Sequence, residues 1–308
     1  MIKKEFKTID EQYNALVERG LKSVYLTENE IKNKLLNNNY YRMSGYSLTL
    51  RNNDVFNSDA SFEKFFEIYD CDAEMRNIIF GALQKVECRI KSIFAYAYAR
   101  ITQNPYDYKN INNYDMNPYN TSINDKQYLK RIEERSNRFN HIIQKVDKIK
   151  TQDEKNELYL KHYKEKYNDE LPIWIYVELM TFYDISQLFN LLKLSMKEEI
   201  TSLIGYNKVS LLSNHLYCCS LLRNFCAHGH RLYNRVFSTK PHLQSKYRKI
   251  LLKIDNKIID NRLYNYYLVL KQILLPNDFE PLKVSVNELF NKYSLINIKE
   301  YGFPDDWI

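Results

Sequence analysis

Residues 78–94, which read IIFGALQKVECRIKSIF, decide the fold class of this chain. Apolar side chains recur there at the three- and four-residue spacing of one α-helical face, at Ile78, Ile79, Leu83, Val86, Ile90, Ile93 and Phe94. The helical pattern extends from Ser61 to about Thr102, with a break expected near residues 70–72. These residues predict a long core helix against which other helices pack.

Helical periodicity recurs along most of the 308 residues. The chain has only 6 glycines and 7 prolines, and no alternation of apolar and polar residues indicates strands. Capping boxes at residues 8–11 and 27–30 predict the starts of two helices. Gly20 and the asparagines at 37–39 predict their ends, and residues 40–46 are expected to form a turn or loop. The sequence therefore predicts an all-α fold.

The middle of the chain differs in composition from its flanks. Residues 103–124 are rich in Asn, Tyr, Asp and Pro and predict an irregular connection. Residues 125–168 are highly charged, and we interpret them as a solvated helical arm. We expect a single domain over residues 1–308, with the N-terminal helices in residues 1–60 and this arm as an insertion.

The second half of the chain predicts a further series of helices. Pro172 suits the first turn of a helix over 173–182, and Asp184 can cap the next helix, over 185–193. A largely buried helix is expected at about 208–231. Three C-terminal helices are expected within residues 244–294, at 244–254, 258–275 and 281–293.

Composition narrows the class of protein. Five irregularly spaced cysteines and an amino terminus without an apolar signal core lead us to expect a reducing cytoplasm. No run of about 20 apolar residues predicts a membrane span. Lys and Arg number 45 against 38 for Asp and Glu, and the net charge of +7 suits a polyanionic partner without requiring one. We assign no common function to the 27 tyrosines, although exposed tyrosines can stack on nucleic-acid bases.

Residues 223–235, which read RNFCAHGHRLYNR, gather three arginines, two histidines and two asparagines. On a helix, Asn224 and His228 lie one turn apart, as do Arg231 and Arg235. The long side chain of Arg223 can swing toward the same cleft near a helix end. The pattern predicts that these polar groups converge on one site.

This cluster suits metal-independent cleavage of RNA through its 2′-hydroxyl group. The reaction needs a base, an acid and cations that hold the charge of the phosphorane, and histidine serves as base or acid near neutral pH. We expect His228 to transfer protons, Arg223 to bind the phosphate oxygens, and Asn224 to orient His228 or bind phosphate. The reaction needs both an acid and a base, whereas the motif supplies one histidine at this position. A second copy of the chain would supply the other, which favours a homodimer with a composite site.

Other interpretations of these residues stay open. His228 alone also fits a histidine that interacts with the helix dipole, and Arg223 fits a partner for an acidic residue. The neighbours expected to contact RNA are His230, Arg231, Tyr233, Asn234 and Arg235, although the two arginines fit salt bridges within the fold equally well.

Charged residues on the long helix have structural interpretations as well. Glu87 and Arg89 are candidates for a network that supports Arg223, and an ion pair inside the fold is the stronger interpretation. Capping and salt-bridge roles are expected for the groups near the break, Asp70, Asp72 and Arg76. Adjacent helical cysteines diverge and no Cys-x2-Cys pair exists, so the sequence predicts neither zinc nor another metal or cofactor.

The motif resembles that of HEPN ribonucleases, in which Arg, a polar residue, three further positions and His follow one another. Its longer form, Arg-Asn-x-Cys-Ala-His-x-x-Arg-Leu-Tyr-Asn-Arg, is similar to that of Abi-like (abortive infection, AbiD/AbiF-type) phage-resistance proteins. Gly229 departs from the family pattern, which has a polar or aromatic residue there. The resemblance covers roughly residues 25–240, with further blocks in the family's order at 40–46, 68–76, 86–92 and 172–182.

The resemblance implies an all-α HEPN-type bundle with additional helices, dimerisation around the motif, and an endoribonuclease that acts as a toxin in antiviral defence. RNA is the implied partner, both as target and as a bound structured noncoding RNA. The alternative is a catalytically silent or masked RNA-binding protein that sequesters a small noncoding RNA or a protein partner.

Overall fold

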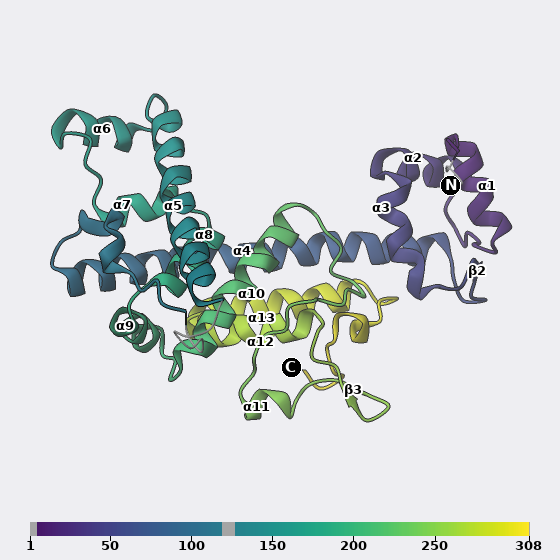
Figure 1. Ribbon diagram of the computed structural model, residues 1–308. Coiled ribbons are helices and arrows are strands. Elements are labelled where there is room, and N and C mark those ends of the chain that lie inside the picture. Colours follow the sequence, from purple (N-terminus) through teal and green to yellow (C-terminus); the bar gives the residue numbers. More distant parts are fainter. Residues whose placement is uncertain (1–4, 119–126, 308) are drawn as a thin grey trace. The chain divides into compact units, whose positions relative to one another are not determined.

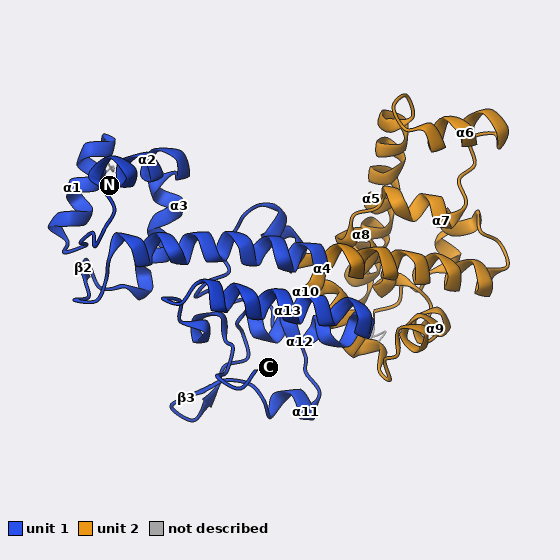
Figure 2. Cartoon of the chain, turned by 180° about the vertical axis from the view of Figure 1, so that it is seen from behind, with its two compact units in different colours: residues 1–82, 223–308 blue, residues 83–222 orange. Residues whose placement is uncertain are grey.

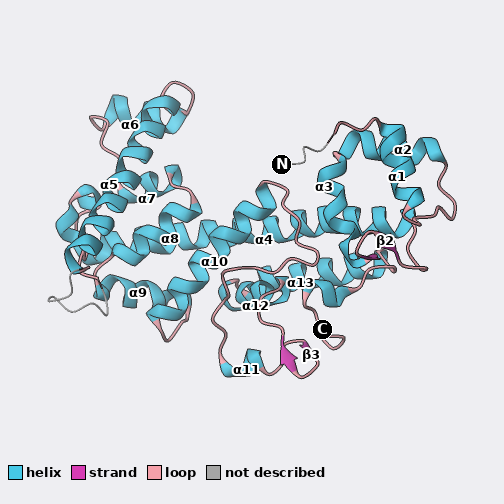
Figure 3. Cartoon of the chain, turned by 45° about the vertical axis from the view of Figure 1, so that its right-hand side comes forward, coloured by secondary structure: helices cyan, strands magenta, loops and turns pink. Residues whose placement is uncertain are grey.

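The computed structural model describes residues 5–118 and 127–307, and Figure 1 shows their elements in chain order. Helices form nearly all of the regular structure, as the cyan ribbons of Figure 3 show. Within the described residues the strands pair in two short antiparallel hairpins, β1 (Arg51–Asn52) with β2 (Val55–Phe56) and β3 (Lys253–Ile254) with β4 (Lys257–Ile258). The predicted all-α fold class is confirmed.

The chain divides into two compact units, which Figure 2 draws in different colours. Unit 1 comprises residues 1–82 and 223–308, and unit 2 comprises residues 83–222. Two helices, α4 (Phe62–Thr102) and α10 (Val209–Ala227), have residues in both units.

Unit 1 combines the first and the last helices of the chain. Aromatic rings fill much of its core, and those less than 2% exposed include Tyr46, Phe62, Phe65, Tyr264, Tyr266, Tyr301 and Phe303. Besides the two hairpins and its parts of α4 and α10, its elements are α1 (Ile9–Glu18), α2 (Glu28–Asn38), α3 (Tyr40–Ser44), α11 (Ser245–Arg248), α12 (Leu263–Ile273), α13 (Pro276–Lys292) and the 3-10 helices η1 (Gly45–Thr49) and η5 (Ile298–Tyr301).

The first two helices begin and end as predicted. Thr8 and Glu11 form a capping box, in which each side chain accepts a hydrogen bond from the backbone of the other, and Thr27 and Glu30 form the second. Gly20 follows α1 with a φ of +96°, and α2 ends within the predicted run of asparagines. Local sequence signals therefore suffice for these helix boundaries.

Two predictions for the following residues are wrong. Residues 40–46 form α3 and the start of η1 instead of a loop, because Asn39 caps α3 with its side chain, which accepts a hydrogen bond from Tyr41 N. The break expected at 70–72 does not occur, and α4 runs without interruption. Asp72 lies inside this helix because its carboxyl group finds partners elsewhere in unit 1, as described below.

The C-terminal helices also differ from their predicted ranges. α10 ends at Ala227 and not at 231. The helix expected over 244–254 reduces to α11 and the start of the β3–β4 hairpin, where Asp255 and Asn256 adopt φ values of 48° and 61° in the turn. α12 begins at Leu263, after the expected start at 258. α13 begins with Pro276 in its first turn and contains Pro281, which was expected to open it.

Unit 2 contains the charged middle of the chain. Its elements, besides its parts of α4 and α10, are α5 (Tyr128–Asp153), α6 (Leu158–Lys166), α7 (Ile173–Tyr176), α8 (Phe182–Leu191), α9 (Leu194–Ile204) and the 3-10 helices η2 (Asp107–Lys109), η3 (Ile111–Asn113) and η4 (Val177–Leu179). The predicted arm corresponds to α5 and α6. α5 packs against α8 and buries Phe139, Ile142 and Val146. Residues 119–126, which belong to the predicted connection and the start of the arm, lie outside the described residues.

The helices after the arm start as predicted only in part. Pro172 directly precedes α7, but this helix is only four residues long. Thr181, and not Asp184, caps α8: the Thr181 hydroxyl accepts a hydrogen bond from Asp184 N at 3.2 Å, and the Asp184 carboxylate accepts one from Thr181 N at 3.0 Å. Asp184 is therefore the third residue of a capping box.

The apolar stripe of residues 78–94 is largely buried. Five of its residues, Ile79, Leu83, Val86, Ile90 and Phe94, are at most 1% exposed, and Ile78 and Ile93 are half-buried. Throughout residues 5–118 and 127–307, no helix has both the length and the apolar composition needed to cross a lipid bilayer.

Candidate functional site

The candidate site lies in unit 1 at the carboxyl end of α10, where a Schellman motif terminates the helix. His230 N donates to Phe225 O at 2.9 Å, and Gly229 N donates to Cys226 O at 3.0 Å. Gly229 has a φ of +64°, in the left-handed region that residues with a Cβ atom disfavour. The helix therefore ends before His230, and the chain leaves it in a new direction.

Arg223 and Asn224 lie on the last turn of this helix, and His228 directly follows its last residue. His228 N donates to Asn224 O at 3.0 Å, so the two residues are one turn apart, in the spacing expected from the sequence. The Arg223 guanidinium carbon lies 5.6 Å from the centre of the Phe80 ring, a cation–π contact with α4. Arg223 and Asn224 are half-buried and His228 is exposed. The arrangement holds the arginine against the fold and leaves the imidazole open to solvent.

A second imidazole adjoins the first. The ring centres of His228 and His230 are 6.3 Å apart, with the rings nearly perpendicular. Burial lowers the pKa of His230, and the positive charges of Arg235, His228, Arg42 and Arg76 lower it further. The site is therefore cationic, and the neutral form of His230 is favoured.

Arg231 and Arg235 do not share a helical face, so that expectation is wrong. Gly229 ends the helix before both residues. Arg231 Nη1 donates to Gly45 O at 2.6 Å. The guanidinium carbon of Arg235 lies 4.0 Å from the centre of the Phe225 ring, and burial lowers the pKa of Arg235. Both arginines are half-buried and make contacts within unit 1.

Two of the residues expected to contact RNA take part in the packing of unit 1. Tyr233 is 2% exposed, and its ring meets the Tyr301 ring edge-on with centres 5.2 Å apart. Asn234 has a φ of 50°, donates its amide hydrogen to Glu300 O at 3.1 Å and accepts a hydrogen bond from Arg262 through its side chain. Both positions thus have partners within unit 1.

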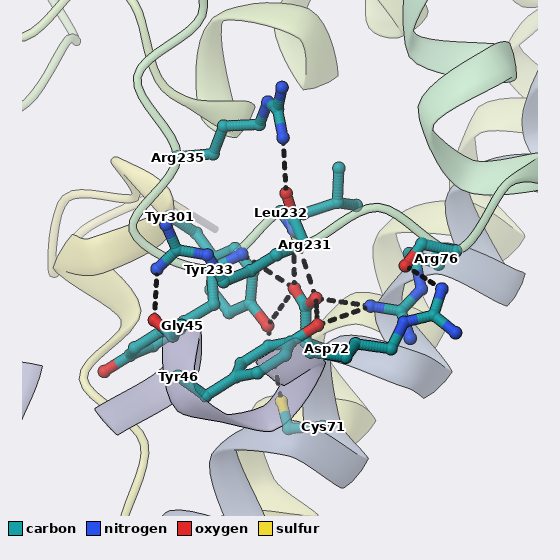
Figure 4. A network of polar contacts seen from close by, with 12 residues as sticks. Gly45, Tyr46, Cys71, Asp72, Arg76, Arg231, Leu232, Tyr233, Arg235 and Tyr301 are labelled. Carbon is teal, nitrogen blue, oxygen red and sulfur yellow. Dashed lines mark hydrogen bonds and ion pairs between the residues drawn. The ribbon is translucent and has the colours of Figure 1, made fainter. Parts of the chain in front are cut away.

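Asp72 of α4 holds the segment that follows α10. Its carboxyl oxygens accept hydrogen bonds from Leu232 N at 3.1 Å and from Tyr233 N at 2.7 Å. These amides would otherwise be buried without partners, which is costly in the interior. Figure 4 shows this carboxyl group at the centre of the surrounding contacts. The sequence alone did not indicate that Asp72 binds the motif.

Side chains complete the surroundings of Asp72. The hydroxyl groups of Tyr46 and Tyr301 donate to it at 2.7 and 3.0 Å, and Arg76 forms an ion pair with it (Figure 4). Burial raises the pKa of Asp72, and the Arg76 charge together with the hydrogen bonds opposes that rise. The predicted salt-bridge role of Asp72 and Arg76 is confirmed, and Asp70 pairs with Lys34.

Arg42 of α3 is a second residue that sequence reasoning did not assign to the site. Its Nη2 donates to Gly229 O at 2.7 Å and to His228 O at 3.2 Å. A Cβ atom placed on Gly229 would lie only 2.3 Å from this nitrogen. The contact with Arg42 therefore explains why a glycine occupies position 229, where the family pattern has a polar or aromatic residue. The signal that could have drawn attention to Arg42 is its place in the block at 40–46.

The two residues proposed to support Arg223 belong to unit 2, whereas Arg223 belongs to unit 1. Glu87 Oε1 lies 3.4 Å from Lys91 Nζ, in an ion pair between residues one helical turn apart. Arg89 Nη2 donates to Ile204 O at 3.5 Å, among other contacts. Glu87 therefore forms an ion pair within the fold, and Arg89 contacts a backbone carbonyl group.

The cysteines near the motif are free thiols in the interior. Burial raises the pKa of Cys218 and of Cys226 to about 12 and also raises that of Cys219. The thiolate form, which binds metals, is thereby disfavoured. In the part of the chain that the structure describes, no three His, Cys, Asp or Glu side chains are grouped so that they could hold a metal ion.

Fold and site together define an all-helical protein with a cluster of arginines and histidines at the end of a buried helix. The chain belongs to the Abi-like protein family, because the family model matches residues 33–234. The matched range begins in α2 and includes Arg42, Asp72 and the motif as far as Asn234. No curated protein and no solved structure was found to match.

Proposed function

We propose that this chain is a metal-independent endoribonuclease of the HEPN type that acts in abortive-infection defence against phage. The observation that carries the proposal is the cationic cluster at the carboxyl end of α10, where Arg223 and Asn224 lie on the last turn and the exposed His228 follows directly. Membership in the Abi-like family supports the defence role.

The residues fit the steps of RNA cleavage. His228 accepts the proton of the 2′-hydroxyl, and the 2′-oxygen attacks the adjacent phosphorus. Arg223 donates hydrogen bonds to the non-bridging oxygens, whose negative charge grows in the phosphorane. An acid protonates the departing 5′-oxygen, so the products are a 2′,3′-cyclic phosphate and a 5′-hydroxyl end. Asn224 orients the imidazole or binds the phosphate.

The acid and the base must act on opposite sides of the phosphorus, so the reaction needs two proton-transfer groups. We propose that a second copy of the chain supplies the second His228, in a homodimer whose two-fold axis passes through a composite site. The ring of His230, 6.3 Å from that of His228 in the same chain, is the alternative source. A bound structured noncoding RNA is a further proposed partner.

The test of this function uses the purified chain, single-stranded RNA and EDTA. We expect cleavage with a 2′,3′-cyclic phosphate at the new end, and we expect a 2′-deoxy substitution at the cleaved nucleotide to block it, because the attacking oxygen is then absent. Cleavage of the 2′-deoxy substrate would contradict the mechanism. RNA that co-purifies uncut, with no activity after its removal, would favour a silent RNA-binding protein.

A further inference from the structure

A cavity of about 660 Å³ lies in unit 1 beside α3. Its walls come from α1, α3, η1, the β1–β2 hairpin and the residues before α1. Its volume falls within the range of about 300–1,000 Å³ that is common for ligand sites. We call it the α3 cavity.

The lining of the α3 cavity combines exposed aromatic rings with positive charges. Tyr41 is 84% exposed and Phe6 is 87% exposed, although rings of this size usually pack against protein. Tyr40 and Ser44 line it as well, and its charged residues are Lys7, Arg19 and Arg51 against Glu5 and Asp54. Arg51 pairs with Asp54 at 3.0 Å. Open aromatic faces next to cations suit an unstacked base and its phosphate.

The α3 cavity adjoins the candidate site through a single short helix. Tyr40 and Tyr41 of α3 line the cavity, and the next residue, Arg42, reaches the carbonyl groups of His228 and Gly229. Only Nη2 of Arg42 makes these bonds. Among the described residues, its Nη1 and Nε donate to no protein group, and the residue is exposed. A guanidinium group in this position retains donors for a phosphate between the cavity and the site.

We propose that the α3 cavity binds an unpaired nucleotide of the RNA that neighbours the cleaved one, with Tyr41 stacking on its base and Arg42 binding the intervening phosphate. The proposal rests on the proposed function, since it names a subsite of the same reaction. RNA is favoured over a peptide because the open rings lie beside a guanidinium group that already contacts the catalytic segment.

Binding to a cleavage-deficient protein tests the subsite without requiring catalysis. In the His228→Ala background, the affinity for a fluorescein-labelled single-stranded oligoribonucleotide is measured by anisotropy. Tyr41→Ala should weaken binding about 5- to 100-fold, the usual effect of losing one stacking partner, whereas Tyr41→Phe should retain it. Tyr96→Ala is the matched control, because Tyr96 is 59% exposed but lies in unit 2. Equal affinity with and without Tyr41→Ala would overturn the proposal and leave the cavity to a protein partner.

Cleavage by the otherwise unaltered chain separates this proposal from the proposed function. Tyr41→Ala should raise KM and change the nucleotide preference next to the cleaved position, while kcat at saturating RNA stays within about 3-fold, since Tyr41 does not touch the reacting atoms. Arg42→Lys should restore part of the binding that Arg42→Ala loses. Active enzyme with unchanged KM and preference in Tyr41→Ala would refute the subsite and leave the ribonuclease proposal standing.

Discussion

Gly229 meets two requirements that no other residue type meets at once. Its φ of +64° directs the chain out of α10, and the missing side chain leaves room for Arg42 Nη2 on the last carbonyl groups. Both features fix where His228 and His230 lie relative to the helix end. A change at this one position therefore affects the backbone and the Arg42 contact together.

Gly229→Ala should lower the free energy of unfolding by about 1–2 kcal/mol, the usual cost of a left-handed conformation for a residue with a Cβ atom. The methyl group also displaces Arg42, so RNA binding should weaken. Gly81→Ala is the control, since Gly81 lies inside α4 and a Cβ atom there meets no described atom within 4 Å apart from its chain neighbours and the backbone of its own helix. That variant should gain about 0.5–1 kcal/mol. Urea denaturation of both variants measures the difference, and a loss of equal size in both would contradict this account.

The carboxyl group of Glu63 makes the free energy of unfolding depend on pH in the acidic range. Its Oε1 accepts hydrogen bonds from the backbone nitrogens of Val24, Tyr25 and Leu26 and from the Ser23 hydroxyl. Burial raises the pKa of this carboxyl group, but the hydrogen bonds outweigh burial and lower it to about 2, below its usual value of 4.5.

Because the folded-state pKa of Glu63 is depressed, its contribution to stability is complete above pH 4.5 and is lost as the pH falls toward 2. Glu63→Gln removes the ionisable group. The difference in the free energy of unfolding between the wild-type chain and this variant should therefore shrink between pH 4.5 and pH 2. A difference that stays constant over this interval, measured by urea denaturation at each pH, would rule out the assigned role.

Among the elements, α4 and the segment after α10 depend on one another through Asp72. This residue connects the long helix to backbone amides that lie 160 and 161 positions later in the chain. Removing one partner from a buried ion pair leaves the other without compensation, which is much more costly than changing a pair at the surface.

Asp72→Asn should lower the free energy of unfolding by about 3–5 kcal/mol, since Arg76 then lacks its buried counter-charge. Asp59→Asn is the matched control: Asp59 pairs with Lys64, its side chain is 69% exposed, and its loss should cost far less because solvent screens the pair. Equal losses in the two variants, from urea midpoints with unchanged slopes, would show that Asp72 does not organise the segment.

The elements that were predicted correctly are specified by residues close to one another in the sequence. The capping boxes at Thr8 and Thr27 and the apolar stripe of α4 are local patterns, and the structure confirms them. The break expected at Asp72 was wrong because its partners are distant in sequence. The end of α10 was placed too late because a single glycine inside a helical pattern does not reveal a left-handed φ. The one-turn spacing of Asn224 and His228 was predictable, whereas the contact of Arg42 with the same segment was not, because Arg42 arrives from another helix.

At the scale of the whole molecule, the proposed dimer predicts how mixtures of wild-type and His228→Ala chains behave. If each composite site needs His228 from two copies, an excess of the His228→Ala chain should suppress wild-type activity, because mixed dimers lack one of the two groups. The active species should have twice the 37.2 kDa mass of the chain by light scattering. Undiminished activity in the mixture would show that one chain contains both groups and would point to His230.

The central claim is that Arg223 and His228 cleave RNA, and the most direct test is the rate of RNA cleavage in EDTA by the Arg223→Ala and His228→Ala variants. His162→Ala, which changes an exposed histidine of unit 2, is the control, and circular dichroism checks that all variants keep their helices. We expect each site variant to lose at least about 100-fold in rate, the usual contribution of a general base for His228 and of a donor to the transition-state charge for Arg223. The control should cleave like the wild-type chain. Wild-type rates in both site variants would contradict the account.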